Sequence, residues 1–306
     1  MKQKLKIFKP VLTQESYQKK LNLPLNEKID LSLAVIQEWY EYWNGNVYVS
    51  FSGGKDSTVL LHLVRSIYED VPAVFLNTGL EYPEIKKFVR KEKNVIELKP
   101  KLNFLEVINK YGYPLISKEI SEITYEMRNT KSDKLFDSRL YGKNGKFGLP
   151  KKWRFLIRAP FNISHICCHK LKKDPAKRYE KITNQKPFIG TMIGESNLRV
   201  TNYFRTGCNA FNNTRPVSNP LSFWTEQDII DYIFEYNIPY CEIYDTGVTR
   251  TGCMFCCFGI HLQPEPNKFQ LMKQSHPHIY KYCMETLQVK YMIEWVNKYL
   301  KKKINY

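Results

Sequence analysis

The stretch Val47-Tyr48-Val49-Ser50-Phe51-Ser52-Gly53-Gly54-Lys55-Asp56-Ser57 decides the fold of this chain of 306 residues. Its apolar beginning predicts a buried strand, and Thr58–Val64 predicts a helix directly after the glycines. Two glycines let the backbone turn its N–H groups onto an anion, and the dipole of the following helix adds a favourable field there. The spacing is not G-x-x-x-x-G-K-[ST], the Walker pattern. The junction therefore predicts a phosphate-binding loop of another kind.

Three further apolar segments, 73–79, 94–98 and 187–194, alternate with helical segments, and a helix is expected over 29–42. Strands that alternate with helices predict an α/β fold with a doubly wound parallel sheet, in which ligands bind at the carboxyl ends of strands. The glycine-rich loop and the polar turns that close 73–79 and 187–194 stand at such ends. We therefore expect these three signals to form one site.

The composition indicates a globular protein, because 43% of residues are hydrophobic and 14% are aromatic. There is no apolar N-terminal segment of the signal-peptide kind and no run long enough to span a bilayer. We expect a cytoplasmic protein with no membrane partner. The net charge of +17 favours a polyanionic partner, although lysine-rich composition along the whole chain explains it equally well.

The chain divides into three expected regions, with the oligomeric state left open. An irregular arm over 1–28 and a helix make up 1–45, an α/β nucleotide-binding domain follows over 46–250, and 251–306 holds a Cys-x-x-Cys segment and C-terminal helices. A basic insertion over 128–158 has ten Lys and Arg against two Asp, interleaved with aromatic residues that include Phe147. The insertion either contacts phosphates and stacked bases or packs its aromatic rings on the core.

Eight cysteines in a chain without secretion signals point to metal binding or catalysis more than to disulfides. Cys167 and Cys168 are adjacent, and Cys253 and Cys256 form a Cys-x-x-Cys turn about 85 residues later. Four thiolates suit a [4Fe–4S] cluster or a structural zinc ion.

Several motifs in a fixed order resemble the phosphoadenosine phosphosulfate (PAPS) reductase family of the PP-loop ATP pyrophosphatase superfamily. They are Ser52–Ser57, Asn77–Glu84, Cys167-Cys168 with Lys172, Lys173 and Pro175, Gly194-Glu195-Ser196 with Arg199, Pro220-Leu221 with Trp224 and Asp228, and Tyr244–Cys253. The resemblance implies an adenine nucleotide α-hydrolase-like fold that binds ATP or a related adenine nucleotide. By similarity to cluster-bearing adenosine phosphosulfate (APS) reductases, it implies a [4Fe–4S] cluster on Cys167, Cys168, Cys253 and Cys256, with Zn²⁺ as the alternative.

One departure from the family separates two activities. Sulfonucleotide reductases carry a nucleophilic cysteine on a C-terminal Glu-Cys-Gly-x-His segment, and no cysteine follows Cys283 here. The resemblance then favours the thiolating branch, in which ATP adenylates an oxygen of DNA or tRNA and sulfur replaces AMP. That branch implies a cysteine desulfurase or another sulfur donor as partner. An APS or PAPS reductase with its nucleophile at Cys208, Cys257 or Cys283 stays open, as does a non-catalytic nucleotide-sensing or nucleic-acid-binding module.

Each candidate residue has an expected role. The loop binds phosphate through Ser52, Gly53, Gly54 and Ser57, and Lys55 adds charge. Asp56 orients the loop, helps to bind Mg²⁺ or caps the helix. The nucleotide is approached by Thr78, Gly79 and Glu81, the last of which is alternatively a helix cap.

The two arginines and two further cysteines each have alternative roles. Arg199 contacts phosphate, as the resemblance implies, or makes a surface ion pair. Arg250 contacts phosphate or the sulfides of a cluster, or pairs with Asp245. Cys208 and Cys257 carry a persulfide, serve packing or take the place of a metal ligand.

Overall fold

A six-stranded, mostly parallel sheet forms the framework of the computed structural model, which describes residues 12–142 and 148–306. Its strands lie in the order β3 (Val95–Leu98), β2 (Ala73–Leu76), β1 (Val47–Ser50), β5 (Lys186–Ile189), β7 (Val217–Ser218) and β6 (Asn209–Ala210). β1 runs parallel to both neighbours, with Val49 opposite Ala73 and Phe188, and β6 is antiparallel to β7. The predicted α/β class with a doubly wound parallel sheet is confirmed.

The chain folds into two compact units whose segments alternate along the sequence. The first unit contains residues 1–75, 87–97 and 179–241, and the second contains 76–86, 98–178 and 242–306. The region 46–250, expected as one nucleotide-binding domain, therefore contributes to both units. Among the residues that the structure describes, no helix is both long and apolar enough to cross a membrane.

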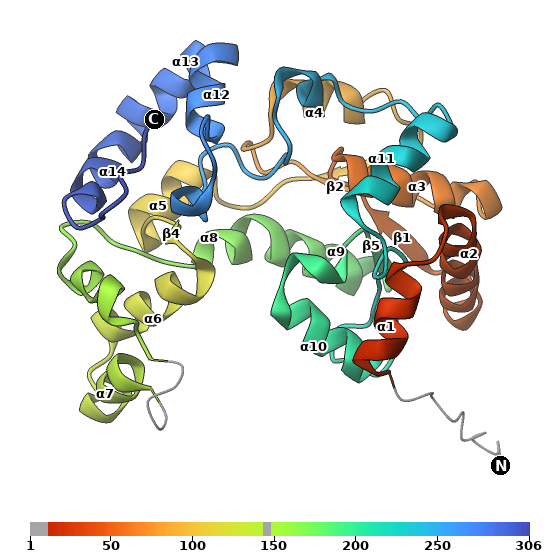
Figure 1. Ribbon diagram of the computed structural model, residues 1–306, viewed down its shortest axis with the longest axis horizontal. Coiled ribbons are helices and arrows are strands. Elements are labelled where there is room, and N and C mark those ends of the chain that lie inside the picture. The colour runs from red at the N-terminus through yellow and green to blue at the C-terminus, as the bar shows by residue number, and fades with distance from the viewer. Residues whose placement is uncertain (1–11, 143–147) are drawn as a thin grey trace. The chain divides into compact units, whose positions relative to one another are not determined.

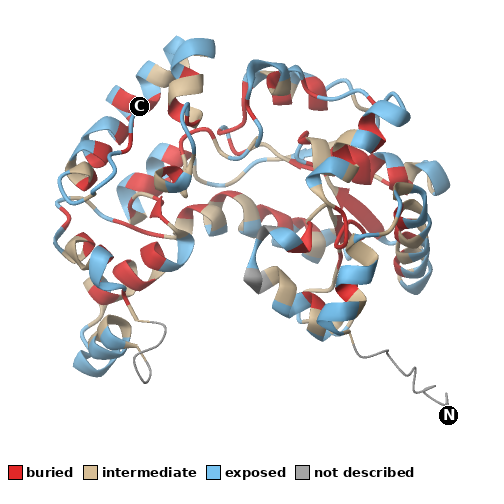
Figure 2. Ribbon diagram, in the orientation of Figure 1, coloured by how far each residue is buried: buried red, intermediate tan, exposed pale blue. Residues whose placement is uncertain are grey.

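Helices cover both faces of the sheet in the first unit. They are α1 (Gln14–Leu21), α2 (Leu25–Tyr42), α3 (Lys55–Ile67), α10 (Asn197–Thr206) and α11 (Glu226–Glu235). α3 packs against β1, α2 and α11, and Figure 1 shows α10 on the opposite side. The first three residues of β1 and of β2 are buried (Figure 2), which explains the continuous apolar run at 47–49, whereas β3 at the edge is partly exposed. The expectation of an irregular arm over 1–28 is wrong for α1, which Thr13 begins with a capping box, and residues 1–11 lie outside the described part.

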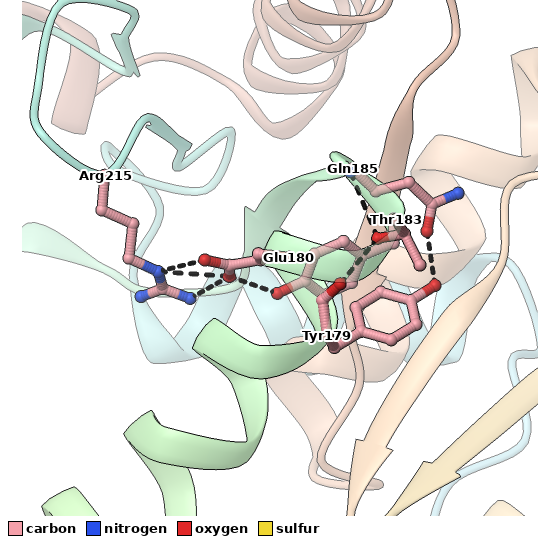
Figure 3. Close-up of polar contacts among 6 residues, drawn as sticks. Tyr179, Glu180, Thr183, Gln185 and Arg215 are labelled. Carbon is pink, nitrogen blue, oxygen red and sulfur yellow. Dashed lines mark hydrogen bonds and ion pairs between the residues drawn. The ribbon is translucent and has the colours of Figure 1, made fainter.

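A partly buried charge cluster holds the amino end of β1. Helix α9 (Asp174–Thr183) carries Glu180, whose carboxylate accepts the hydroxyl of Tyr48 at 2.7 Å. Arg215 forks onto the same carboxylate, with 2.9 Å from Nε to Oε2 and 2.5 Å from Nη2 to Oε1 (Figure 3). Bidentate, charge-assisted contacts of this kind fix geometry as well as adding energy. They tie α9, β1 and the segment before β7 together.

The second unit is mainly helical. Its elements are α5 (Phe104–Tyr111), β4 (Leu115–Ile116), α6 (Lys118–Asn129), α7 (Asp133–Tyr141), η1 (Lys151–Arg158), α8 (Ile166–Cys168), η2 (His169–Lys173), η4 (Glu242–Thr246), β8 (Cys257–Phe258), η5 (Ile260–Leu262), α12 (Lys268–Ser275), α13 (Pro277–Lys281), η6 (Tyr282–Thr286) and α14 (Val289–Asn297). β4 and β8 pair in parallel, with Leu115 opposite Cys257. Helix α4 (Pro83–Val89) and the 3₁₀ turn η3 (Ile193–Glu195) complete the chain.

The basic insertion over 128–158 packs some of its aromatic rings on the core, as one of its two expected roles requires, and its contact with nucleic acid stays a prediction. Trp153 and Leu156 are buried in η1, and the ring of Phe155 stacks on Tyr299 with 4.3 Å between centroids. Tyr141, by contrast, is exposed at the end of α7. Phe147 lies outside the described residues. The insertion thus anchors part of its aromatic content in the second unit and leaves part on the surface.

Candidate functional site

The glycine-rich loop in the first unit has the backbone of an anion cradle. Gly53 has a φ of 72°, in the left-handed region that favours glycine, and Gly54 is the extended N-cap of α3. The N–H of Ser52 donates to Ser57 Oγ at 3.1 Å, the N–H of Gly54 donates to Ser52 Oγ at 3.3 Å, and Ser57 Oγ donates to the Gly54 carbonyl at 2.9 Å. The two hydroxyls therefore hold the loop over the amino end of α3, where helices attract anions.

Lys55 and Asp56 stand in the first turn of α3. Lys55 Nζ lies 2.9 Å from Glu226 Oε1, and the Lys55 side chain is 12% exposed whereas that of Glu226 is 60% exposed. An ion pair with so exposed a carboxylate adds little stability. A Cβ on Gly190 would lie 3.0 Å from the carbonyl oxygen of Asp56. Gly190 thus lets the end of β5 approach the loop.

The second candidate loop, with Thr78, Gly79 and Glu81, belongs to the second unit. Both carboxylate oxygens of Glu81 accept from Thr78, from its N–H at 3.0 Å and from its hydroxyl at 2.6 Å. Glu81 therefore braces this turn from within, and α4 begins two residues later. The N–H of Met254 donates to the carbonyl of Leu80 at 2.9 Å, which joins the turn to the Cys-x-x-Cys segment.

The four cysteines predicted as ligands lie together in the second unit. Cys167 and Cys168 end α8, and Cys253 and Cys256 precede β8. Burial raises the pKa of the Cys167 and Cys168 thiols, and the neighbouring Cys253 thiol raises both further. Burial also raises the pKa of Cys256. Thiols that are costly to ionise alone lose their protons when a metal cation supplies the balancing charge.

The donor set fits a thiolate-bound metal centre by its chemistry. All four cysteines are free thiols, from two segments that fold against each other in one unit. Over residues 12–142 and 148–306, no three His, Cys, Asp or Glu side chains stand close enough together to hold a metal ion as they are placed. Closing a metal centre therefore requires the cysteine side chains to move toward one another.

Two lysines accompany the cysteines. Lys172, on η2, hydrogen-bonds to Cys253, and the Cys253 thiolate raises the pKa of this buried ammonium while burial opposes the shift. Lys268 donates to the carbonyl of Cys253 at 3.5 Å and also to that of Cys256. In the sequence, Lys268 stands out only as the first residue of α12, where the helix dipole disfavours a cation.

The two candidate arginines lie in different units. Arg199 donates through Nη1 to the carbonyl of Met192 at 3.2 Å, and it lines a cavity of about 260 Å³ with Thr191, Asn219 and Ser222 in the first unit. Arg250 is exposed in the second unit, three residues before Cys253. Either placement leaves phosphate contact as a prediction.

Cys208 and Cys257, the candidate persulfide carriers, are both buried. Burial raises the pKa of Cys208 to about 11 and that of Cys257 well above its usual value. Cys208 belongs to the first unit, whereas Cys257 contributes to β8 of the second. Because a sulfur carrier needs an accessible thiolate, these positions favour the packing role.

A family model, the phosphoadenosine phosphosulfate reductase domain, matches residues 46–258. The chain belongs to this family. The match begins just before β1 and ends with β8. It contains the glycine-rich loop Ser52–Ser57 and the four cysteines predicted as ligands, and it leaves α12, α13 and α14 outside.

Individual relatives are distant. An uncharacterised protein of Methanocaldococcus jannaschii is 26% identical over 265 residues, which cover 84% of this chain and 52% of that protein. This chain thus spans about half the length of that relative. An adenosine 5'-phosphosulfate reductase of Bacillus cereus is 23% identical over 80% of this chain and 88% of its own. The PAPS reductase of Candida auris, a solved structure, is 18% identical over 79% of this chain and 96% of its own, with a TM-score of 0.42.

Proposed function

We propose that this member of the PAPS reductase family is an ATP pyrophosphatase that adenylates an oxygen of a nucleic acid and so prepares that position for sulfur. The observation that carries the proposal is the loop Ser52–Ser57, whose positive-φ glycine, paired hydroxyls and helix N-terminus suit the phosphates of a nucleotide. In this proposal ATP binds there with Mg²⁺, and Asp56 orients the loop or contributes a ligand to the metal ion.

The chemistry balances without an oxidant. An acceptor oxygen attacks the α-phosphorus of ATP, the bond to the β-phosphate oxygen breaks, and pyrophosphate leaves with its Mg²⁺. A sulfur nucleophile at the oxidation level of sulfide then displaces AMP from the acceptor. Lys55, once it leaves Glu226, neutralises charge on the departing pyrophosphate, and the N–H groups at the start of α3 hold the same oxygens. A cysteine desulfurase with a reductant that releases hydrosulfide is a suitable sulfur donor.

The cysteine cluster is the proposed second centre. Cys167, Cys168, Cys253 and Cys256 would hold a [4Fe–4S] cluster, with Zn²⁺ as the alternative. Such a cluster, when bound, supplies a thiophilic site for sulfide. Lys172 and Lys268 bring positive charge to the four thiolates, and they keep the Cys253–Cys256 turn in place through their hydrogen bonds.

The distribution of charge supports a nucleic acid as the acceptor. The second unit holds 29 Lys and Arg against 14 Asp and Glu, whereas the first holds 18 against 16. Nearly the whole excess of +17, namely +15, is therefore in the unit that contains the cysteines. General lysine richness would spread the excess over both units. A polyanion is the partner that such a concentration attracts.

Sulfonucleotide reduction is the second candidate, because relatives named APS reductase cover most of this chain. That reaction requires a nucleophilic thiolate. Outside the four-cysteine cluster, Cys208, Cys241, Cys257 and Cys283 are all buried, and burial raises the pKa of Cys283 to about 12. None of these four placements favours attack on a bound substrate.

The test compares products under anaerobic conditions. Protein loaded with iron and sulfide receives ATP, hydrosulfide and a mixture of tRNA or DNA, and AMP and pyrophosphate are measured. We expect both products to depend on the nucleic acid, and Lys55→Ala to reduce their rate at least tenfold. Lys181→Ala, an exposed lysine of α9, is the matched control and leaves the rate unchanged. Release of sulfite from APS with a thiol reductant, without ATP consumption, would establish the reductase instead.

A further inference from the structure

A hollow of about 370 Å³ opens beside the Cys-x-x-Cys turn of the second unit. Three segments build it: the loop and helix that follow β2, the two residues between Cys253 and Cys256, and the helical run of α13 and η6. The last of these lies beyond residue 258, where the match to the family model ends. Part of the wall is therefore an addition to the shared domain.

Aromatic rings form one side of the hollow. The rings of Phe255 and Tyr282 lie 5.9 Å apart between centroids at 54°. Phe255 is buried, whereas Tyr282 is 43% exposed although the next two residues, Cys283 and Met284, are buried. Tyr282 also begins a π-helical turn, an irregularity that is frequent at functional sites. An exposed ring beside a buried one is a platform on which a planar ligand can stack.

The charges around the hollow suit an anion next to that ligand. Lys86 and His278 line it, and Glu81 is the one carboxylate among its described lining residues. Both oxygens of Glu81 already accept from Thr78. A planar ring with a phosphate attached, which is a nucleotide, matches this combination of aromatic surface and cation.

We propose that this hollow receives one unstacked base of the acceptor nucleic acid, with Lys86 on an adjoining phosphate. The inference rests on the proposed function, since it names the place of that reaction's acceptor. Met254 and Phe255 line the hollow, so a base held there lies beside the cysteines that flank these two residues in the chain. The volume is at the low end for ligand sites and suits a single base rather than a longer segment. Stacking requires the base to leave its helix, so the acceptor is single-stranded or locally opened.

The test measures the binding of a fluorescent single-stranded oligonucleotide of mixed sequence, and ATP affinity in parallel. We expect Tyr282→Ala to weaken oligonucleotide binding about tenfold or more and Tyr282→Phe to keep it within about twofold. Lys86→Gln should weaken binding and lower the slope of log K against log salt by about 0.7, the value for one phosphate contact on a single strand. Tyr291→Ala, another exposed tyrosine of the second unit, is the control and leaves both affinities unchanged.

Two results would overturn the inference. In the first, Tyr282→Ala lowers ATP affinity and leaves oligonucleotide affinity unchanged, which would assign the hollow to the adenine of ATP. In the second, the wild-type protein binds no oligonucleotide, or all variants bind it equally. The proposed function fails separately: base binding that depends on Tyr282, with no AMP or pyrophosphate formed, would support the hollow and reject adenylation.

Discussion

Replacing Gly190 by alanine should displace the phosphate loop, because the added Cβ would press on the backbone of Asp56 and Ser57. Gly190 lies after β5, and its φ is outside the left-handed region, so alanine is compatible with the backbone. The added Cβ would stand 3.0 Å from the carbonyl oxygen of Asp56, 3.3 Å from its carbonyl carbon and 3.4 Å from the Cα of Ser57. All three atoms belong to the backbone of the first turn of α3. None of them can move away by a change of rotamer.

The expected change in the free energy of unfolding is the difference between two opposing contributions. Overpacking against fixed backbone costs about 1–3 kcal/mol, and the loss of glycine's freedom in the unfolded chain returns about 0.4–1 kcal/mol. Gly194 supplies the matched control, because its Cβ would meet nothing within 4 Å and its φ is also outside the left-handed region. Gly194→Ala should therefore be neutral or slightly stabilising. The difference between the two variants should be about 1–3 kcal/mol.

Urea unfolding and calorimetric ATP titration measure the two consequences. We expect a lower urea midpoint for Gly190→Ala with an unchanged m-value, and a loss of ATP affinity of about tenfold for each 1.4 kcal/mol that the displaced loop loses. If Gly190→Ala matches Gly194→Ala in both midpoint and ATP affinity, the close approach of β5 to the loop is wrong. A loss of stability with intact ATP affinity would separate the loop from nucleotide binding.

Three further predictions concern the metal centre and pH. Cys168→Ala or Cys253→Ala should remove stoichiometric iron from anaerobically purified protein, whereas Cys283→Ala, in the core, should keep it; equal iron in all three would reject the ligand set. Lys268→Met should lower metal retention against a chelator several-fold, since it removes the ammonium bound to the Cys253–Cys256 turn, and unchanged retention would leave Lys268 without a role there. Burial lowers the pKa of His62 below its usual value of 6.5, so the unfolded chain binds this proton before the folded protein does as pH falls. The free energy of unfolding should therefore decrease below about pH 6.5. His62→Gln should lessen that decrease, as measured by urea midpoints at about pH 7.5 and 5.5.

The strands β1, β2, β3 and β5 could be predicted from the sequence, because each is encoded by a local run of apolar residues. The apolar runs at 47–49, 73–79, 94–98 and 187–194 each overlap a strand, and parallel strands between helices allow few topologies. The glycine-rich turn could be predicted as well, because Gly53 has a positive φ and Gly54 is the N-cap of α3. The helix Gln14–Leu21 was missed because its polar surface leaves little periodicity, and its capping box at Thr13 and Ser16 lacks the usual Glu or Gln.

The site was harder to predict, because the roles of its residues are set by distant partners. Glu81 is recognisable as part of a motif, yet only the fold shows that Thr78 occupies both of its oxygens. Lys268 stands outside the family motifs, and it reaches the Cys-x-x-Cys turn through the packing of α12. Cys208 and Cys257 follow polar or metal-binding motifs in the sequence, but tertiary packing buries both thiols. The sequence thus identifies candidate reactive side chains, and their burial in the fold decides which of them a substrate can reach.

The net charge can be interpreted only when it is assigned to the two units of the fold. As a property of the chain, +17 is explained equally well by lysine-rich composition and by a polyanionic partner. The fold places +15 of it in the second unit, with the four-cysteine cluster and the Phe255–Tyr282 platform, and leaves the phosphate loop in a unit that is nearly neutral at +2. Charge concentrated in the unit that holds the four cysteines is the arrangement expected of an enzyme whose acceptor is itself a long polyanion, which is the acceptor that we propose.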